Sequence, residues 1–209
     1  MPRPVNHTRR QTLAREAFAL LRANPSGLKM TELAARLGLK RPTLYYYFQD
    51  TAAITEAAMT DLLARQQAHL VEQLVGRHHP VDLLDTWGEA VRTFYASNPN
   101  DLALFATIMA HCDARVGGPL AARLAQHLRP VQELAVRTLR DGLARGLVEP
   151  CEPEAVVTLV ASVIQGALLA WHTEGHDPEA TLAALWSLAL APLRIPRLVA
   201  TEELAARGD

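Results

Sequence analysis

Residues 40–47 of the chain, KRPTLYYY, contain the side chains with the clearest chemical potential. Arg41 can donate two hydrogen bonds to the acceptor edge of guanine, a contact that discriminates by about 1–3 kcal/mol per base. Thr43 can donate to a base or a phosphate, and Pro42 can pack on a thymine methyl group. Lys40 offers a positive charge to phosphate. This run predicts a surface that reads duplex DNA.

Two short helices separated by a turn must position these side chains. The first helix has one apolar stripe, formed by Leu33, Ala34 and Leu37. Gly38 can then adopt the positive φ that a sharp turn needs. The second helix begins at Arg41, and a proline is tolerated in its first turn. This order predicts a DNA-binding helix-turn-helix.

The spacing of the second helix predicts an inward and an outward face. Leu44 and Phe48 lie four residues apart and are expected to pack inward. Tyr46 and Tyr47 are expected to point outward. Two interpretations of Tyr45 remain open: a core residue with only its hydroxyl group at the surface, or a member of the DNA-facing surface.

This segment resembles the DNA-reading end of the TetR family of bacterial transcriptional repressors. The matching residues are Thr31, Leu33, Ala34, Leu37, Gly38, Leu39, Pro42, Thr43, Leu44, Tyr45 and Phe48, with Leu13, Ala17, Phe18 and Leu21 before them. The resemblance covers roughly the first quarter of the chain. It implies that Tyr45, Tyr46 and Tyr47 contact the sugar–phosphate backbone.

Three residues depart from the family pattern. Lys40 stands where the family usually has a small capping residue, and Pro42 replaces a glycine that many members have. Thr51 replaces a lysine that commonly contacts phosphate at the start of the next helix. We expect Thr51 to donate to a phosphate oxygen without adding a charge.

The charge of the chain is divided unevenly along its length. Residues 1–50 hold nine Lys and Arg against three Asp and Glu, whereas residues 51–209 hold twelve against nineteen. The net charge of −1 is therefore a cancellation between a basic amino-terminal part and an acidic remainder. A basic region that coincides with the helix-turn-helix is what attraction to phosphate requires.

Other chemistry is weakly represented. Cys112 and Cys151 are far apart and lack metal-type spacing. His172 and His176 have the spacing of a helical metal pair, but Gly175 places His176 in a turn. We expect no catalytic site, no metal, no cofactor and no enzymatic activity. No apolar run of about 18 residues is evident, so we expect a soluble, cytoplasmic protein without a membrane span.

The sequence pattern predicts an all-α fold, with a three-helix head on a larger helical body. About nine helices are expected, at residues 8–23, 30–37, 41–48, 50–75, 81–97, 99–111, 119–145, 152–173 and 177–190. The first is expected to start with a capping box from Thr8 to Gln11. We expect a helix-turn-helix domain at residues 1–50, an effector-binding and dimerisation domain at 51–195, and a tail at 196–209.

The last two helices are apolar around most of their circumference, which requires burial on several sides. An extra face buried against a second copy of the chain would explain this, and an unusually central position within one chain is the alternative. The residues expected at a dimer interface are Val160, Ile164, Leu168, Leu182, Leu185 and Trp186.

The resemblance also implies a small-molecule effector bound among the body helices. Mixed aromatic and polar residues are the candidates for its pocket: Trp87, Phe94, Tyr95, Phe105, Met109, His111, Gln165 and His172. For any apolar member, ordinary core packing is the alternative, whereas a buried polar group needs a partner.

These observations favour a ligand-responsive homodimeric repressor of a pseudo-palindromic operator in double-stranded DNA. A dimer would present two recognition helices about 34–36 Å apart, or a multiple of that distance. The alternative is a helical small-molecule-binding or assembly module that has lost DNA binding, for which Thr51 is the one hint in the sequence. An all-α enzyme is a third possibility that no residue pattern supports.

Overall fold

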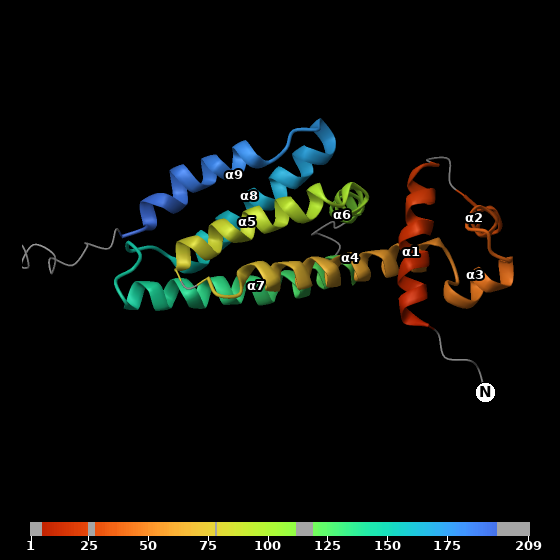
Figure 1. The fold of residues 1–209 in the computed structure, drawn as a ribbon, viewed down its shortest axis with the longest axis horizontal. Helices are drawn as coiled ribbons and strands as arrows, with labels where there is room; N and C mark the ends of the chain where they lie inside the picture. Colours follow the sequence, from red (N-terminus) through yellow and green to blue (C-terminus); the bar gives the residue numbers. More distant parts are fainter. Residues whose placement is uncertain (1–5, 25–27, 78, 112–118, 196–209) are drawn as a thin grey trace, which may run out of the picture. The chain divides into compact units, whose positions relative to one another are not determined.

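The computed structural model describes residues 6–24, 28–77, 79–111 and 119–195, and these residues are almost entirely helical (Figure 1). The helices are α1 (His7–Arg22), α2 (Met30–Arg36), α3 (Arg41–Tyr47), α4 (Thr51–Leu74), α5 (Pro80–Ala96), α6 (Pro99–His111), α7 (Pro119–Ala144), α8 (Pro153–Glu174) and α9 (Glu179–Leu185). A π-helical turn, η1 (Trp186–Leu190), and a 3₁₀ turn, η2 (Ala191–Leu193), follow α9. The predicted all-α fold is confirmed.

The first helix begins one residue earlier than expected, and its N-cap is a different residue from the one predicted. The side chain of Asn6, not Thr8, accepts a hydrogen bond from the backbone N–H of Arg9 at 3.0 Å. Asparagine is among the best N-cap residues, so α1 already begins at His7.

The end of the last helix also differs from expectation. A single helix is expected to run to about Leu190, but regular α-helix ends at Leu185. The wider turn of η1 then carries the chain to η2, which contains Pro192. Apolar periodicity cannot distinguish a π turn from an α turn over five residues.

The chain comprises two compact units, one formed by Met1–Gln67 with Asn98–Leu124, and the other by Ala68–Ser97 with Ala125–Asp209. The first unit is larger than the expected head of residues 1–50, because it includes most of α4 and all of α6. Helix α4 belongs to both units.

A buried ion-pair cluster joins three helices of the first unit. Asp61 on α4 and Asp101 on α6 are only 5% and 8% exposed. Arg65 on α4 donates from Nε to Asp61 at 2.9 Å, and its two terminal nitrogens donate to Asp101 at 2.6 and 2.9 Å. Nε of Arg15 on α1 lies 3.3 Å from the same oxygen of Asp61. The paired carboxylates raise the pKa of Arg65.

In the second unit, α5 packs against both α8 and α9. The close approach needs Gly88, because a Cβ atom there would lie 3.2 Å from Leu182 on α9 and 3.9 Å from Ile164 on α8. Gly142 on α7 similarly admits the ring of Pro80, which would lie 2.5 Å from a Cβ atom. Arg92 on α5 also bridges Glu89 and Asp177, which precedes α9.

The residues expected at a dimer interface are mostly on the wrong face of their helices. Val160, Ile164, Leu168 and Leu185 are buried within the single chain, and Leu182 and Trp186 are half-buried. The exposed apolar residues of the same region are Leu159, Leu169 and Leu188, at 47%, 42% and 80% exposure. An all-round apolar helix does not reveal which side the chain itself covers.

Helix α8 corrects the expectation that no segment could span a membrane. Residues Pro153–Glu174 form a helix of 22 residues that is long and apolar enough to cross a membrane, by length and composition alone. A core helix of a soluble protein passes the same test, and α8 lies against α5 and α9 within its unit.

Replacing Asp101 by Asn should lower the free energy of unfolding by about 2–3 kcal/mol, because it leaves the Arg65 guanidinium with one charged partner instead of two. Denaturant unfolding measures this difference. The exposed pair between Arg140 and Glu154 is the control: Glu154→Gln should change the unfolding midpoint little. Equal losses in the two variants would contradict a special role for the buried cluster.

Candidate nucleic-acid interface

The turn between α2 and α3 is fixed by two backbone hydrogen bonds. Gly38 adopts a φ of +66°, which glycine tolerates best. Its N–H donates to the carbonyl of Ala35 at 3.1 Å, and the N–H of Leu39 donates to Ala34 at 2.8 Å. These two bonds form a Schellman motif, which satisfies the last carbonyls of α2 and sets the direction of α3.

Helix α3 has sharply different faces. Leu44 and Phe48 are fully buried. Tyr45 and Tyr46, on the opposite side, are 42% and 46% exposed. The core interpretation of Tyr45 is therefore wrong, and Tyr45 belongs to the outward face. Tyr47 is half-buried, with its ring 5.1 Å from that of Tyr46 in an edge-on arrangement.

The first turn of α3 presents the expected polar side chains. Lys40, Arg41 and Pro42 are exposed and Thr43 is half-buried. The guanidinium carbon of Arg41 lies 5.3 Å from the centre of the Tyr45 ring. This cation–π contact restrains a long side chain at the surface while its nitrogens remain able to donate.

Arg10 has a structural contact that sequence reasoning misses. Its guanidinium carbon lies 5.2 Å from the centre of the buried Phe48 ring. Its Nε also lies 3.4 Å from the carbonyl oxygen of Tyr47, at the last residue of α3. Through these two contacts Arg10 ties α1 to the end of α3. A cation at a helix carboxyl terminus is stabilising.

The next helix begins directly behind α3. The carboxylate of Asp50 accepts from the N–H of Ala53 at 2.7 Å and so caps α4. Thr51 is the first residue of α4 and is half-buried. It holds the position at which the resemblance implies a phosphate contact.

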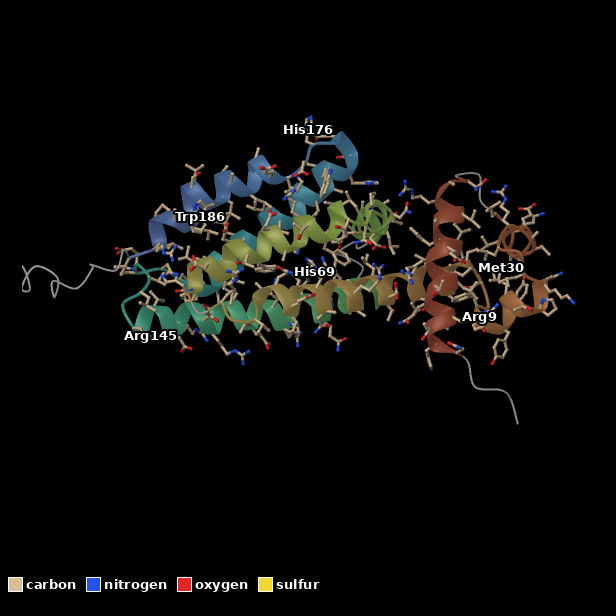
Figure 2. The ribbon with its side chains drawn as sticks, viewed as in Figure 1. Arg9, Met30, His69, Arg145, His176 and Trp186 are labelled. Atoms are coloured by element: carbon tan, nitrogen blue, oxygen red, sulfur yellow. The ribbon has the colours of Figure 1, made fainter. Side chains whose placement is uncertain are left out.

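The basic residues of the described amino-terminal part are mostly exposed. Besides Lys40 and Arg41, the exposed cations are Arg9, Arg15, Arg22, Lys29 and Arg36. Figure 2 labels Arg9 on α1 and Met30 at the start of α2. Arg15 is partly neutralised by Asp61, and Arg36 donates to the side chain of Asn24 at 2.9 Å. The others leave a positive field that suits phosphate.

The eight candidate effector residues fall in both compact units. Trp87, Phe94 and Tyr95 on α5 and Phe105 on α6 are buried, and Met109 and Gln165 are half-buried. His172 is exposed, which removes the premise that it is a buried polar group. The side chain of His111 lies outside the described residues. The assignment of these residues to a ligand stays a prediction.

Around Phe94 the structure adds a polar neighbour. The His69 ring lies 5.7 Å from that of Phe94, and Nε2 of His69 is 3.4 Å from the hydroxyl oxygen of Thr93. Tyr95 packs edge-on against Phe94 at 5.1 Å. These contacts are those of a packed core, and periodicity alone would not indicate His69.

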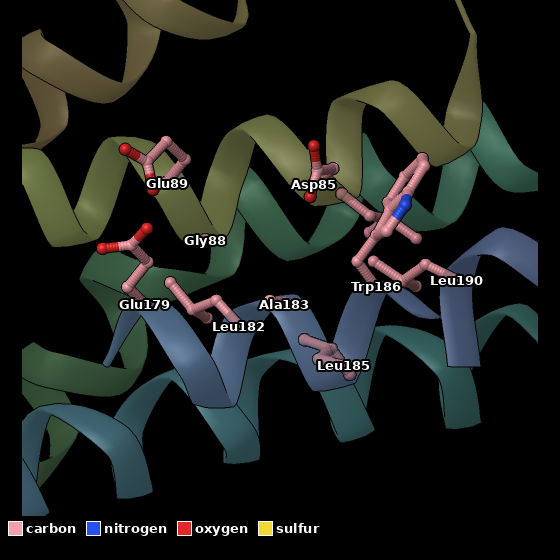
Figure 3. Close-up of a pocket in the computed structure, with 10 residues that line it drawn as sticks. Asp85, Gly88, Glu89, Glu179, Leu182, Ala183, Leu185, Trp186 and Leu190 are labelled. Atoms are coloured by element: carbon pink, nitrogen blue, oxygen red, sulfur yellow. The ribbon is translucent and has the colours of Figure 1, made fainter. Parts of the chain in front are cut away.

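A pocket of about 260 Å³ lies elsewhere in the second unit, between α5 and α9 with η1 (Figure 3). Its lining includes none of the candidate effector residues and contains three carboxylates: Asp85, Glu89 and Glu179. Partial burial raises the pKa of Asp85, with repulsion from Asp82 and Glu89 adding to it. Asp85 and Glu89 lie four residues apart on α5, and this spacing was the one sequence signal that would have placed both carboxylates on the same face of the helix.

The described residues contain no group of three His, Cys, Asp or Glu side chains that could hold a metal ion. His172 and His176 are both exposed, and His176 lies in the turn after α8 (Figure 2). Burial and the neighbouring Glu152 raise the pKa of the Cys151 thiol, which disfavours the reactive thiolate. Cys112 lies outside the described residues.

Comparison with known proteins finds a family match at the amino terminus and a similar fold over most of the chain. Residues 14–58 match the family model of bacterial regulatory proteins, tetR family. No curated protein matches the chain. A TetR transcription regulator from Haloarcula marismortui is similar in structure, with a TM-score of 0.74, 16% identity, and coverage of 90% of this chain and 100% of that one.

Two further solved structures share the fold. The TetR-family regulator PfmR from Thermus thermophilus has a TM-score of 0.67 at 17% identity and covers 88% of this chain and 99% of its own. The ketosteroid transcriptional regulator KstR2 of Mycobacterium tuberculosis has a TM-score of 0.64 at 14% identity, covering 92% and 98%. The chain thus carries an amino-terminal segment that matches the tetR family model, and it shares its fold with TetR-family transcriptional regulators.

Proposed function

We propose that the protein is a cytoplasmic, ligand-responsive repressor that binds a pseudo-palindromic operator as a homodimer and has no enzymatic activity. The observation that carries the proposal is the division of α3 into two faces. Leu44 and Phe48 anchor the helix, while Arg41, Tyr45 and Tyr46 project from it. A helix of this kind suits insertion into the major groove.

We assign Arg41 to a base edge because it is exposed in the first turn of α3, where the Tyr45 ring restrains its guanidinium group. Pro42 and Thr43 lie beside it and would contact a thymine methyl group or the backbone. Lys40, Tyr46, Tyr47 and Thr51 would contact phosphates, which fixes the register of α3 in the groove.

Dimerisation follows from the small size of one recognition helix and from the outward face of α8. Leu159 and Leu169 on this face are exposed, and no atom lies within 4 Å of a Cβ atom built on Gly166. A glycine inside a helix costs about 1 kcal/mol relative to alanine. Close approach of a helix from a second copy would account for both the glycine and the leucines.

A response to ligand requires that binding at a site in the body domain be coupled to the distance between the two DNA-binding heads of the dimer. A ligand that binds better to one spacing shifts the population, and DNA shifts ligand affinity by the same factor. The family resemblance and the similarity to a ketosteroid transcriptional regulator support this part of the proposal. Repression follows when the ligand-free spacing fits the operator.

Replacing Arg41 by Ala should relax the preference for one base by about 1–3 kcal/mol while general affinity for DNA persists. Selection of bound sequences from random duplexes measures this change. Arg41→Lys retains the charge but not the bidentate donor, so it should also lose preference. An unchanged preferred sequence in both variants would remove Arg41 from the base-reading role.

Replacing Lys40 by Ala should weaken binding to all sequences and reduce the salt slope of the binding constant by about 1, because one phosphate contact is lost. Fluorescence anisotropy at several salt concentrations gives the slope. Lys29→Ala, on the loop before α2, provides a second exposed lysine for comparison. A slope unaltered in Lys40→Ala would show that Lys40 does not contact phosphate.

Replacing Leu159 by Glu should convert the dimer to monomers and abolish tight operator binding, because a charge would be buried at the proposed interface. Analytical ultracentrifugation measures the oligomeric state. Val71 on α4 is similarly exposed, at 56%, so Val71→Glu is the matched control and should leave the dimer intact. A dimer that survives Leu159→Glu would exclude this face.

A further inference from the structure

The pocket between α5 and α9 combines an apolar floor with an acidic rim. Leu84, Leu185 and Leu190 are buried at the floor, and Trp186 is half-buried beside them. The three carboxylates around it, Asp85, Glu89 and Glu179, are all exposed. Figure 3 shows Glu89 and Glu179 at one end of the pocket and Trp186 with Leu190 at the other.

The charges around the pocket are unbalanced. Glu89 is paired with Arg92 at 2.6 Å, and the same arginine reaches Asp177 at 3.4 Å. Asp82 is paired with Arg194 at 3.0 Å. Asp85 and Glu179 form no ion pair within the described residues, although Glu179 is close enough to Arg92 to help raise the pKa of that arginine. One arginine thus serves the Glu89 end, while Asp85 lies between that end and the Trp186 ring without a cation of its own.

The turn η1, which follows α9, supplies one wall of the pocket. Trp186 and Leu190 are the first and last residues of this π-helical turn, and both line the pocket. Because they lie four residues apart, they share one face of the turn. Across from them, Gly88 leaves room that a side chain would fill by pressing on Leu182.

We propose that this pocket binds a small organic cation with an apolar body, and that such a cation is the effector of the regulator. The cationic group would lie at Asp85, between the Glu179 end of the pocket and the Trp186 ring, and the apolar body would cover the leucines. Carboxylates and an aromatic face attract a cation by charge and by the ring quadrupole. The regulatory part rests on the proposed function.

The volume and the open rim limit the size of the ligand. At about 260 Å³ the pocket is smaller than the roughly 300–1,000 Å³ typical of drug-sized ligands. A quaternary ammonium ion that bears one ring is a suitable probe, because its charge does not depend on pH. Benzyltrimethylammonium is such an ion, and neopentylbenzene is its neutral counterpart of similar shape.

Isothermal titration calorimetry on the full chain tests binding directly. Benzyltrimethylammonium should bind with one site per chain, whereas neopentylbenzene and benzoate should not. Asp85→Asn and Trp186→Leu should each raise the dissociation constant at least tenfold. Glu133→Gln, on the exposed side of α7 and outside the pocket lining, is the matched charge control and should leave the constant unchanged.

Ala183→Phe separates a ligand site from a surface used by a second copy. Ala183 is exposed and lines the pocket, so a phenyl ring should fill the space without disturbing the core. This variant should lose the cation and keep the oligomeric state of the parent in ultracentrifugation. A change of oligomeric state with no loss of cation binding would overturn the proposal and make the pocket part of an interface.

Operator affinity is measured separately, with the selected duplex and saturating benzyltrimethylammonium. The cation should change the dissociation constant for DNA at least fivefold, and Ala183→Phe should abolish this response. Two outcomes would overturn this inference and leave the proposed function standing. In one, the chain binds operator but not the cation; in the other, it binds the neutral analogue as tightly as the cation. Cation binding by a chain that holds no duplex would overturn the proposed function and leave the binding site standing.

Discussion

The cluster of Arg15, Asp61, Arg65 and Asp101 is the interaction on which the amino-terminal unit depends. Two carboxylates have been removed from water, and each must keep a cation because an uncompensated buried charge is costly. No buried side-chain polar atom of the described residues lacks a hydrogen-bond partner. The consequence is geometric: α1, α4 and the start of α6 must keep one mutual register, so the amino-terminal compact unit extends to α6.

The reading helix is held from its inner side and from both ends. Its amino-terminal end follows the Schellman turn, and its carboxyl-terminal end contacts Arg10 through the Tyr47 carbonyl and the Phe48 ring. The seven residues of α3 are too few to be a stable helix alone, so these contacts have to supply the order. A surface that recognises DNA must be rigid enough for phosphate contacts to set its position.

Sequence predicts the buried face of a helix well where its apolar residues lie on one side of that helix. The stripes of α2 and α3 therefore place the helix-turn-helix and its outward residues well, and the resemblance adds the family. Helix α8 is apolar all round, so the pattern could not say that Val160 and Ile164 are covered by the chain itself. Nor could it reveal the π turn at Trp186, the placement of α6 in the amino-terminal unit, or that Asp85 and Glu179, on two helices, line one pocket.

The two faces of α3 have a practical meaning for redirecting the protein to other DNA sequences. The buried side chains, with Arg10 behind them, carry the fold of the head, whereas Arg41, Tyr45 and Tyr46 contribute little to its core. Under the proposed function, exchange of the outward set for residues of other shape and polarity should alter recognition with little loss of stability. Libraries confined to those positions should therefore yield many well-folded regulators with new operator preferences.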